Sequence, residues 1–220
     1  MNLEYVANRD MEVARAFSRA HYVSARDEAS WRRLRELNPS SVLACDCSWA
    51  WCPAASTSRM PVMLVCKGIK CPEGVEEIAG RTRLEPVWMD SFYGTKEEGA
   101  VEPNSVTACF DMFSESSLVV SSSYHGCVFA AIHGVPFVPL KSVTGKTEQF
   151  AVECYGGYGC PSGDWPSWMD EVRRRLKESM GRFRNRFWLN VPGCRLKDFT
   201  LQVPAEGASW DCVRGGVEGL

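Results

Sequence analysis

Short apolar runs alternate with amphipathic stretches along most of the chain. A continuous apolar run bounded by turn residues is typical of a buried strand, whereas apolar residues three or four positions apart are typical of a helix with one buried face. The alternation of the two predicts an α/β fold, with a Rossmann-like parallel sheet flanked by helices. Strands are expected at residues 21–25, 42–44, 62–66, 84–89, 118–120 and 137–140, and helices at residues 11–20, 27–37, 73–79, 106–113, 124–133, 147–154 and 164–190.

The predicted elements fall into three parts. Residues 53–60 have the composition of a linker. Residues 1–52 therefore form an amino-terminal part of helices and strands, and residues 53–190 form the Rossmann-like domain with its closing helix. Residues 191–220 are expected to be a weakly structured or docked tail.

The stretch at residues 118–140 carries the strongest chemical signal. Its strand ends in three serines and Tyr124-His125-Gly126, and an apolar helix follows. Ligands of open α/β sheets bind beyond the carboxyl ends of the strands, and a helix N-terminus there favours an anion. His125 is thus a candidate for proton transfer beside a bound anion, with a capping or packing role as the alternative. His133 lies inside the apolar helix and is expected to be structural.

Two further basic residues stand where a helix is expected to begin. Arg26 follows a predicted strand, and its guanidinium is suited to a carboxylate or phosphate; a local surface ion pair is the alternative. Lys146 follows Gly145 but lacks the upstream glycine of a P-loop, so it either reaches the anion or is solvated. Residues 173–175 and Lys177 form a basic run that is expected to be a solvated helix face.

The composition excludes several classes of function. The 220 residues carry a net charge of −2, which gives no signal for nucleic acid, and no apolar run is long enough for a signal peptide or a membrane span. The 11 cysteines are odd in number and several lie in apolar runs, which indicates thiols in a reducing compartment and predicts a cytoplasmic location. Cys45, Cys47 and Cys52 lack the paired spacing of a zinc site.

Three motifs together resemble those of the polysaccharide pyruvyl transferase family. The stretch YVSARDEASWRRLRELNPSSVLACD matches the family's (V/I)-S-x-R-D-E-x-S-x-x-x-L pattern, which is followed by an aspartate after the next strand. The stretch SSSYHGCVFAAIHGVPFVPL matches its S-R-x-H-(G/A) turn, apolar helix and G-(V/I)-P. Lys146 stands 21 positions after His125, close to the family's spacing of about twenty. The resemblance covers residues 12–155.

The resemblance implies transfer of pyruvate from phosphoenolpyruvate to two hydroxyls of a sugar acceptor, which gives a cyclic ketal. It implies His125 as the general acid that protonates the enol methylene, or as the residue that stabilises the resulting charge. Arg26 and Lys146 would bind the phosphate and carboxylate, and Ser122, Ser123 and Gly126 are the expected substrate-binding residues of the anion-binding turn. No metal or cofactor is required by this scheme. The implied fold is the carboxyl-terminal half of a GT-B-like arrangement of two Rossmann domains with the active site in the cleft.

The chain departs from the family pattern in ways that leave other interpretations open. Ser123 stands where family members commonly carry arginine, and the segment between Asp46 and His125 is shorter than usual. The amino-terminal Rossmann domain is not evident, so a homo-oligomer or a partner chain is expected to complete the cleft. The alternatives are a GT-B glycosyltransferase, and a non-catalytic relative that binds a glycan or a protein.

Overall fold

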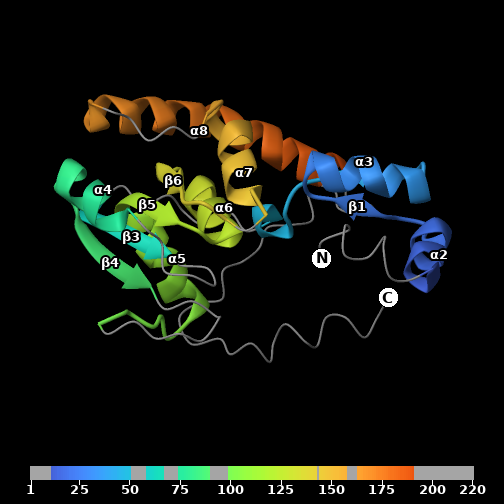
Figure 1. Cartoon of the computed structure of the whole chain (residues 1–220), viewed down its shortest axis with the longest axis horizontal. Coiled ribbons are helices and arrows are strands. Elements are labelled where there is room, and N and C mark those ends of the chain that lie inside the picture. The colour runs from blue at the N-terminus through green and yellow to red at the C-terminus, as the bar shows by residue number, and fades with distance from the viewer. Residues whose placement is uncertain are drawn as a thin grey trace.

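The computed structural model describes residues 11–50, 58–66, 74–89, 99–142, 144–157 and 163–190, and Figure 1 shows their arrangement. Its helices and strands follow each other along the chain largely as the hydrophobic pattern predicts. They are α2 (Met11–Arg19), β1 (Ser24–Ala25), α3 (Glu28–Leu37), β2 (Val42–Leu43), the short 3₁₀ helix η1 (Cys47–Ala50), β3 (Met60–Cys66), α4 (Val75–Thr82), β4 (Glu85–Met89), α5 (Val106–Glu115), β5 (Ser116–Ser121), α6 (Tyr124–Ile132), β6 (Phe137–Pro139), α7 (Lys146–Tyr155) and α8 (Trp165–Asn190).

The main sheet is parallel throughout and has the strand order β4-β3-β5-β6. The chain builds outward from β3 to β4 and then returns to place β5 on the other side of β3. The topological switch point therefore lies between β3 and β5. The pairing of these two strands is irregular between Met60 and Met63, around Pro61, which has no N–H to donate to a neighbouring strand.

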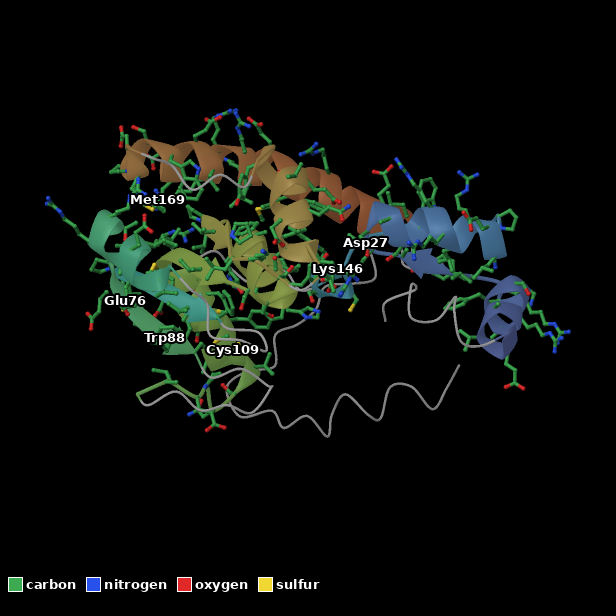
Figure 2. The ribbon with its side chains drawn as sticks, in the orientation of Figure 1. Asp27, Glu76, Trp88, Cys109, Lys146 and Met169 are labelled. Atoms are coloured by element: carbon green, nitrogen blue, oxygen red, sulfur yellow. The ribbon has the colours of Figure 1, made fainter. Side chains whose placement is uncertain are left out.

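Alternate residues of the two central strands enter two separate cores. Met63 and Val65 of β3 face α4 and the start of α8, whereas Leu64 faces α5, α6 and α7. Figure 2 shows Met169 of α8 and Cys109 of α5, which pack against the two different cores. Burial on both faces explains why these strands are continuous apolar runs.

A second, smaller sheet consists of β1 and β2, which pair in parallel. Helix α3 covers it through Leu34, and Asp27 caps that helix by accepting a hydrogen bond from the Ser30 N–H at 2.8 Å. The strand expected at residues 21–25 is shorter than predicted and consists of Ser24 and Ala25 alone. The chain leaves this sheet through η1, which packs against α6 and α8.

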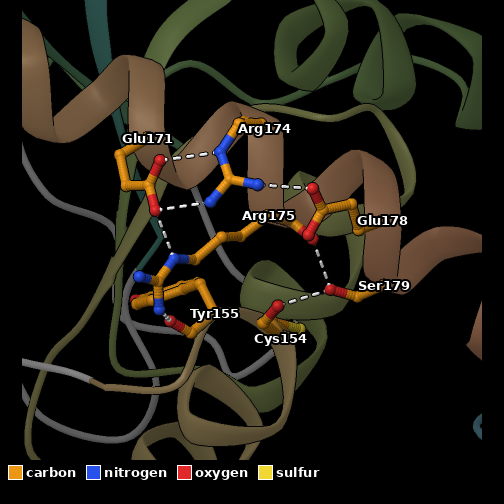
Figure 3. Close-up of polar contacts among 7 residues, drawn as sticks. All are labelled: Cys154, Tyr155, Glu171, Arg174, Arg175, Glu178 and Ser179. Carbon is orange, nitrogen blue, oxygen red and sulfur yellow. Dashed lines mark hydrogen bonds and ion pairs between the residues drawn. The ribbon is translucent and has the colours of Figure 1, made fainter.

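The carboxyl end of α7 is held by α8 (Figure 3). The Arg175 guanidinium donates to the Tyr155 carbonyl at 2.7 Å, and the Ser179 hydroxyl donates to the Cys154 carbonyl. These bonds satisfy carbonyl groups that have no partner within their own helix. They also fix the direction of α7, which begins at Lys146.

Arginines of the basic run form ion pairs with acidic residues of the same helix α8, and Figure 3 shows the pairs of Arg174. Arg173 pairs with Asp170, and Arg174 pairs with both Glu171 and Glu178. This agrees with a solvated helix face rather than a free anion site. No helix in the described part of the chain is long and apolar enough to cross a membrane.

His133 is buried at the end of α6, as expected for a structural histidine. Neither of its ring nitrogens has a hydrogen-bond partner among the described residues. Burial, reinforced by the nearby Arg59, lowers the pKa of His133 to about 4. The Arg59 guanidinium itself donates to the carbonyls of Ser116, His133 and Gly134, which ties the start of β5 to the end of α6.

We expect the free energy of unfolding to fall as the pH drops from about 6.5 to about 4, because the unfolded chain then binds a proton at His133 that the folded chain excludes. The expected loss is about 2 to 3 kcal/mol. His133→Phe removes the titrating group and should abolish this part of the pH dependence. Urea unfolding at pH 7 and pH 4.5 measures the effect. The exposed His21 provides the control, and His21→Gln should leave the dependence unchanged.

Candidate active site

The turn that follows β5 lies at the topological switch point of the main sheet. The Ser122 N–H donates to the Cys66 carbonyl at 3.2 Å, so the turn is bonded to the carboxyl end of β3. The chain then enters α6, with Ser123 at the N-cap and His125 in the first turn. In a doubly wound sheet this edge is where ligands bind.

Gly126 allows α6 to approach the sheet closely. A Cβ at this position would overlap the Ser121 hydroxyl and lie 3.0 Å from Cys66 Cβ. Ser121 is fully buried, and its hydroxyl lies within hydrogen-bond distance of the Cys66 and Ser123 carbonyls. The side of Gly126 that a Cβ would occupy is therefore a packing contact that sets the depth of the helix, and with it the position of His125.

Arg26 and His125 meet at one buried carboxylate. The Asp46 side chain is only 3% exposed, and its Oδ2 accepts a hydrogen bond from Arg26 Nη1 at 2.6 Å. His125 Nε2 lies 3.6 Å from the same oxygen, while the His125 ring is half exposed. Residues that are far apart in the sequence are thus brought to a single point between the two sheets.

Asp46 stays ionised although it is buried. Burial acts to raise the pKa of its carboxyl, but polar contacts from His125, Ser48 and Arg26 outweigh it and hold the pKa well below its usual range. Oδ1 accepts from the Ser48 N–H at 3.0 Å and from the Ser48 hydroxyl at 2.7 Å. The site therefore contains a permanent negative charge that faces one arginine and one histidine.

Tyr124 completes the surroundings of Arg26. The guanidinium carbon lies 4.2 Å from the centre of the Tyr124 ring, an arrangement that favours a cation over the aromatic face. Burial raises the pKa of the Tyr124 hydroxyl, so this group stays neutral. Arg26 is thus held on one edge by Asp46 and on one face by Tyr124.

Lys146 reaches the same region from the start of α7. Its Nζ lies 3.9 Å from Asp27 Oδ2, and Figure 2 shows these two residues close together. A small cavity of about 10 Å³ is lined by Arg26, Asp27, Lys146, Tyr124, Gln149, Phe150 and Glu153. Arg26 and Lys146 therefore line the same cavity. Arg26 and His125 both face the same oxygen of Asp46.

The backbone amides of the turn serines are bonded within the protein. The Ser122 and Ser123 N–H groups donate to the Cys66 carbonyl and the Ser121 hydroxyl, so neither is available to an anion. The amide groups of the first turn of α6, from Tyr124 onward, are the ones left without a partner inside the helix. Hydroxyl contacts from Ser122 and Ser123 to a substrate remain a prediction.

Sequence reasoning gave no role to Asp46 or Tyr124. Asp46 was visible only as an acidic residue beyond a predicted strand and as part of the family pattern. Its position at the carboxyl end of β2 is the same kind of signal that pointed to His125. Its burial and its two basic partners could not be inferred from the spacing.

The described residues contain no group of three or more side chains suited to a metal ion. Cys45 is buried and donates to the Phe183 carbonyl, Cys47 is exposed, and Cys52 lies outside the described residues. The described cysteines are thiols. The site chemistry available is thus that of two fixed cations, one imidazole and a buried carboxylate.

Comparison of the sequence with known families identifies the family of this chain. The model of the polysaccharide pyruvyl transferase family matches residues 7–142, which include Arg26, Asp46 and His125 but end before Lys146. The match covers more than half of the chain, and the chain therefore belongs to the polysaccharide pyruvyl transferase family. No curated protein and no solved structure matches the sequence.

Gly126→Ala should destabilise the fold, because its methyl group would overlap the Ser121 hydroxyl and press on Cys66. We expect a loss of about 1 to 3 kcal/mol in the free energy of unfolding. Gly80→Ala in α4 is the matched control, since a Cβ at Gly80 meets no atom within 4 Å. Urea unfolding of both variants provides the measurement, and equal stabilities would contradict the packing role of Gly126.

Proposed function

We propose that this chain transfers pyruvate from phosphoenolpyruvate to two hydroxyls of a sugar and so forms a cyclic ketal. The observation that supports this best is the meeting of Arg26 and His125 at the buried Asp46, with Lys146 in the same cavity as Arg26. Phosphoenolpyruvate carries a carboxylate and a phosphate. One arginine and one lysine match these two anionic groups.

In the proposed reaction His125 protonates the methylene carbon of phosphoenolpyruvate. The electron pair of the carbon–carbon double bond forms the new C–H bond, and positive charge develops at C2, where the first acceptor hydroxyl adds. The C2–O bond to phosphate then breaks, and the second hydroxyl closes the ketal. The two hydroxyl protons restore His125 and protonate the leaving phosphate. Arg26 and Lys146 hold the anionic groups in place throughout.

Ser123 stands where the family commonly carries arginine, so the donor site has one guanidinium fewer on α6. Arg26 partly compensates, because the stacked Tyr124 and the buried Asp46 keep it in one orientation. We therefore expect the anionic donor to bind mainly through Arg26 and Lys146. We place this reaction in the cytoplasm, in keeping with the odd number of cysteines and the position of several of them in apolar runs.

The proposal extends to a second chain that completes the cleft. The cavity of about 10 Å³ has room for about one water molecule, whereas typical ligand sites have roughly 300 to 1,000 Å³. Phosphoenolpyruvate and a sugar acceptor together require more room. A homo-oligomer or a partner chain would supply the other wall, as in the two-domain GT-B-like arrangement.

Phosphate release is expected when the protein is incubated with phosphoenolpyruvate and a suitable acceptor from a panel of galactosides and N-acetylmannosamine derivatives. His125→Ala should lower this rate by roughly 10² to 10⁴-fold, because the general acid is lost. His21→Ala is the control histidine variant and should retain the wild-type rate.

Two outcomes would contradict the proposal. Turnover with a nucleotide sugar alone would identify a glycosyltransferase. Silence with every donor, together with binding of a glycan or a protein, would identify a non-catalytic relative.

A further inference from the structure

Asp46 has more partners than a structural ion pair needs. Its Oδ1 accepts two hydrogen bonds from Ser48, and its Oδ2 faces Arg26 at 2.6 Å and His125 at 3.6 Å. The side chain is only 3% exposed, so water cannot replace any of these partners easily. A buried charge is tolerated only when its hydrogen-bonding capacity is satisfied in this way.

The arrangement selects a carboxylate over its amide. Both oxygens of Asp46 face donors: the Ser48 N–H on one side and the Arg26 guanidinium on the other. An asparagine has one acceptor and one donor, so in either orientation its NH₂ group would face an N–H. The position therefore requires an acceptor on both sides and a negative charge beside His125.

We infer that Asp46 is a positioning residue that holds the His125 ring with Nε2 toward the carboxylate, leaving Nδ1 to exchange the proton with substrate. This rests on the proposed function, in which His125 is the general acid. The charged groups that the structure brings to the ring are Asp46 and, on the same carboxylate oxygen, Arg26. Tyr124 and Phe129 contact the ring from α6 itself.

The assignment specifies which nitrogen acts. The doubly protonated ring donates the Nδ1 proton to the methylene carbon of the donor. The neutral ring that remains keeps its hydrogen on Nε2, the nitrogen that faces Asp46 Oδ2 at 3.6 Å. Asp46 thereby favours the tautomer that results from the transfer. Because Arg26 bonds to the same oxygen, Asp46 also fixes the position of the anion-binding guanidinium relative to the proton-donating ring.

The test combines ring ¹⁵N NMR with kinetics on the full chain. The protein has three histidines, so His125→Gln assigns the His125 signals directly. In the neutral wild-type ring we expect the hydrogen on Nε2. In Asp46→Asn the two ring nitrogens should shift toward a mixture of tautomers, and kcat for phosphate release should fall at least tenfold.

Asp164→Asn is the matched control. Asp164 also accepts from the N–H and the hydroxyl of a nearby serine, Ser167, but it lies at the start of α8. This variant should keep the wild-type ring signals and kcat. Where Asp46→Asn does not fold, the wild-type spectrum still decides, because a neutral His125 ring protonated on Nδ1 overturns the inference.

The outcomes separate this inference from the proposed function. An active wild-type protein whose Asp46→Asn variant keeps both the ring signals and kcat within twofold overturns the role of Asp46 alone. A wild-type protein that releases no phosphate with any acceptor overturns the proposed function. In that case the ring spectrum still shows whether Asp46 sets the tautomer.

Discussion

The burial of β3 and β5 on both faces is the constraint on which the rest of the structure depends. Because these strands are parallel and adjacent, each must be reached by a crossover, and their carboxyl ends meet at one edge. The residues of the central pair alternate between two cores, so neither strand can shift by one position without moving apolar side chains to the wrong face. The position of the His125 turn follows from this register.

The candidate site combines a close helix–sheet contact at Gly126 with the buried charge of Asp46. Gly126 sets how deeply α6 lies against the sheet, and Asp46 connects the start of that helix to Arg26, which directly follows β1 of the smaller sheet. A single acidic residue thus supports both basic groups without being exposed to a ligand. Such an arrangement is typical of sites in which the reacting side chains must keep their orientation before the substrate arrives.

The order of elements and the place of the site could be predicted from the sequence because both depend on local pattern. Apolar runs marked the strands, and the polar residues after them marked the ligand-binding edge. Arg26 and Asp46 stand 20 positions apart in the sequence, and their ion pair could not be predicted because it depends on how the small sheet packs. The bond of the Ser122 amide could not be predicted either, because its acceptor, the Cys66 carbonyl, belongs to the neighbouring strand β3. The division of the chain into three parts stays a prediction.

Helix α8 has a mechanical consequence for the site. It contacts α4 beside the main sheet, and farther along it contacts η1 and β2 of the smaller one. Its 26 residues correspond to about 39 Å of continuous helix. Phe183 stacks on Trp49 of η1, which anchors that end. Because this continuous helix contacts both sheets, it resists hinge motion between them. Extra space for a bulky acceptor is therefore gained more readily at the rim of the cavity than by a hinge motion that separates the two sheets.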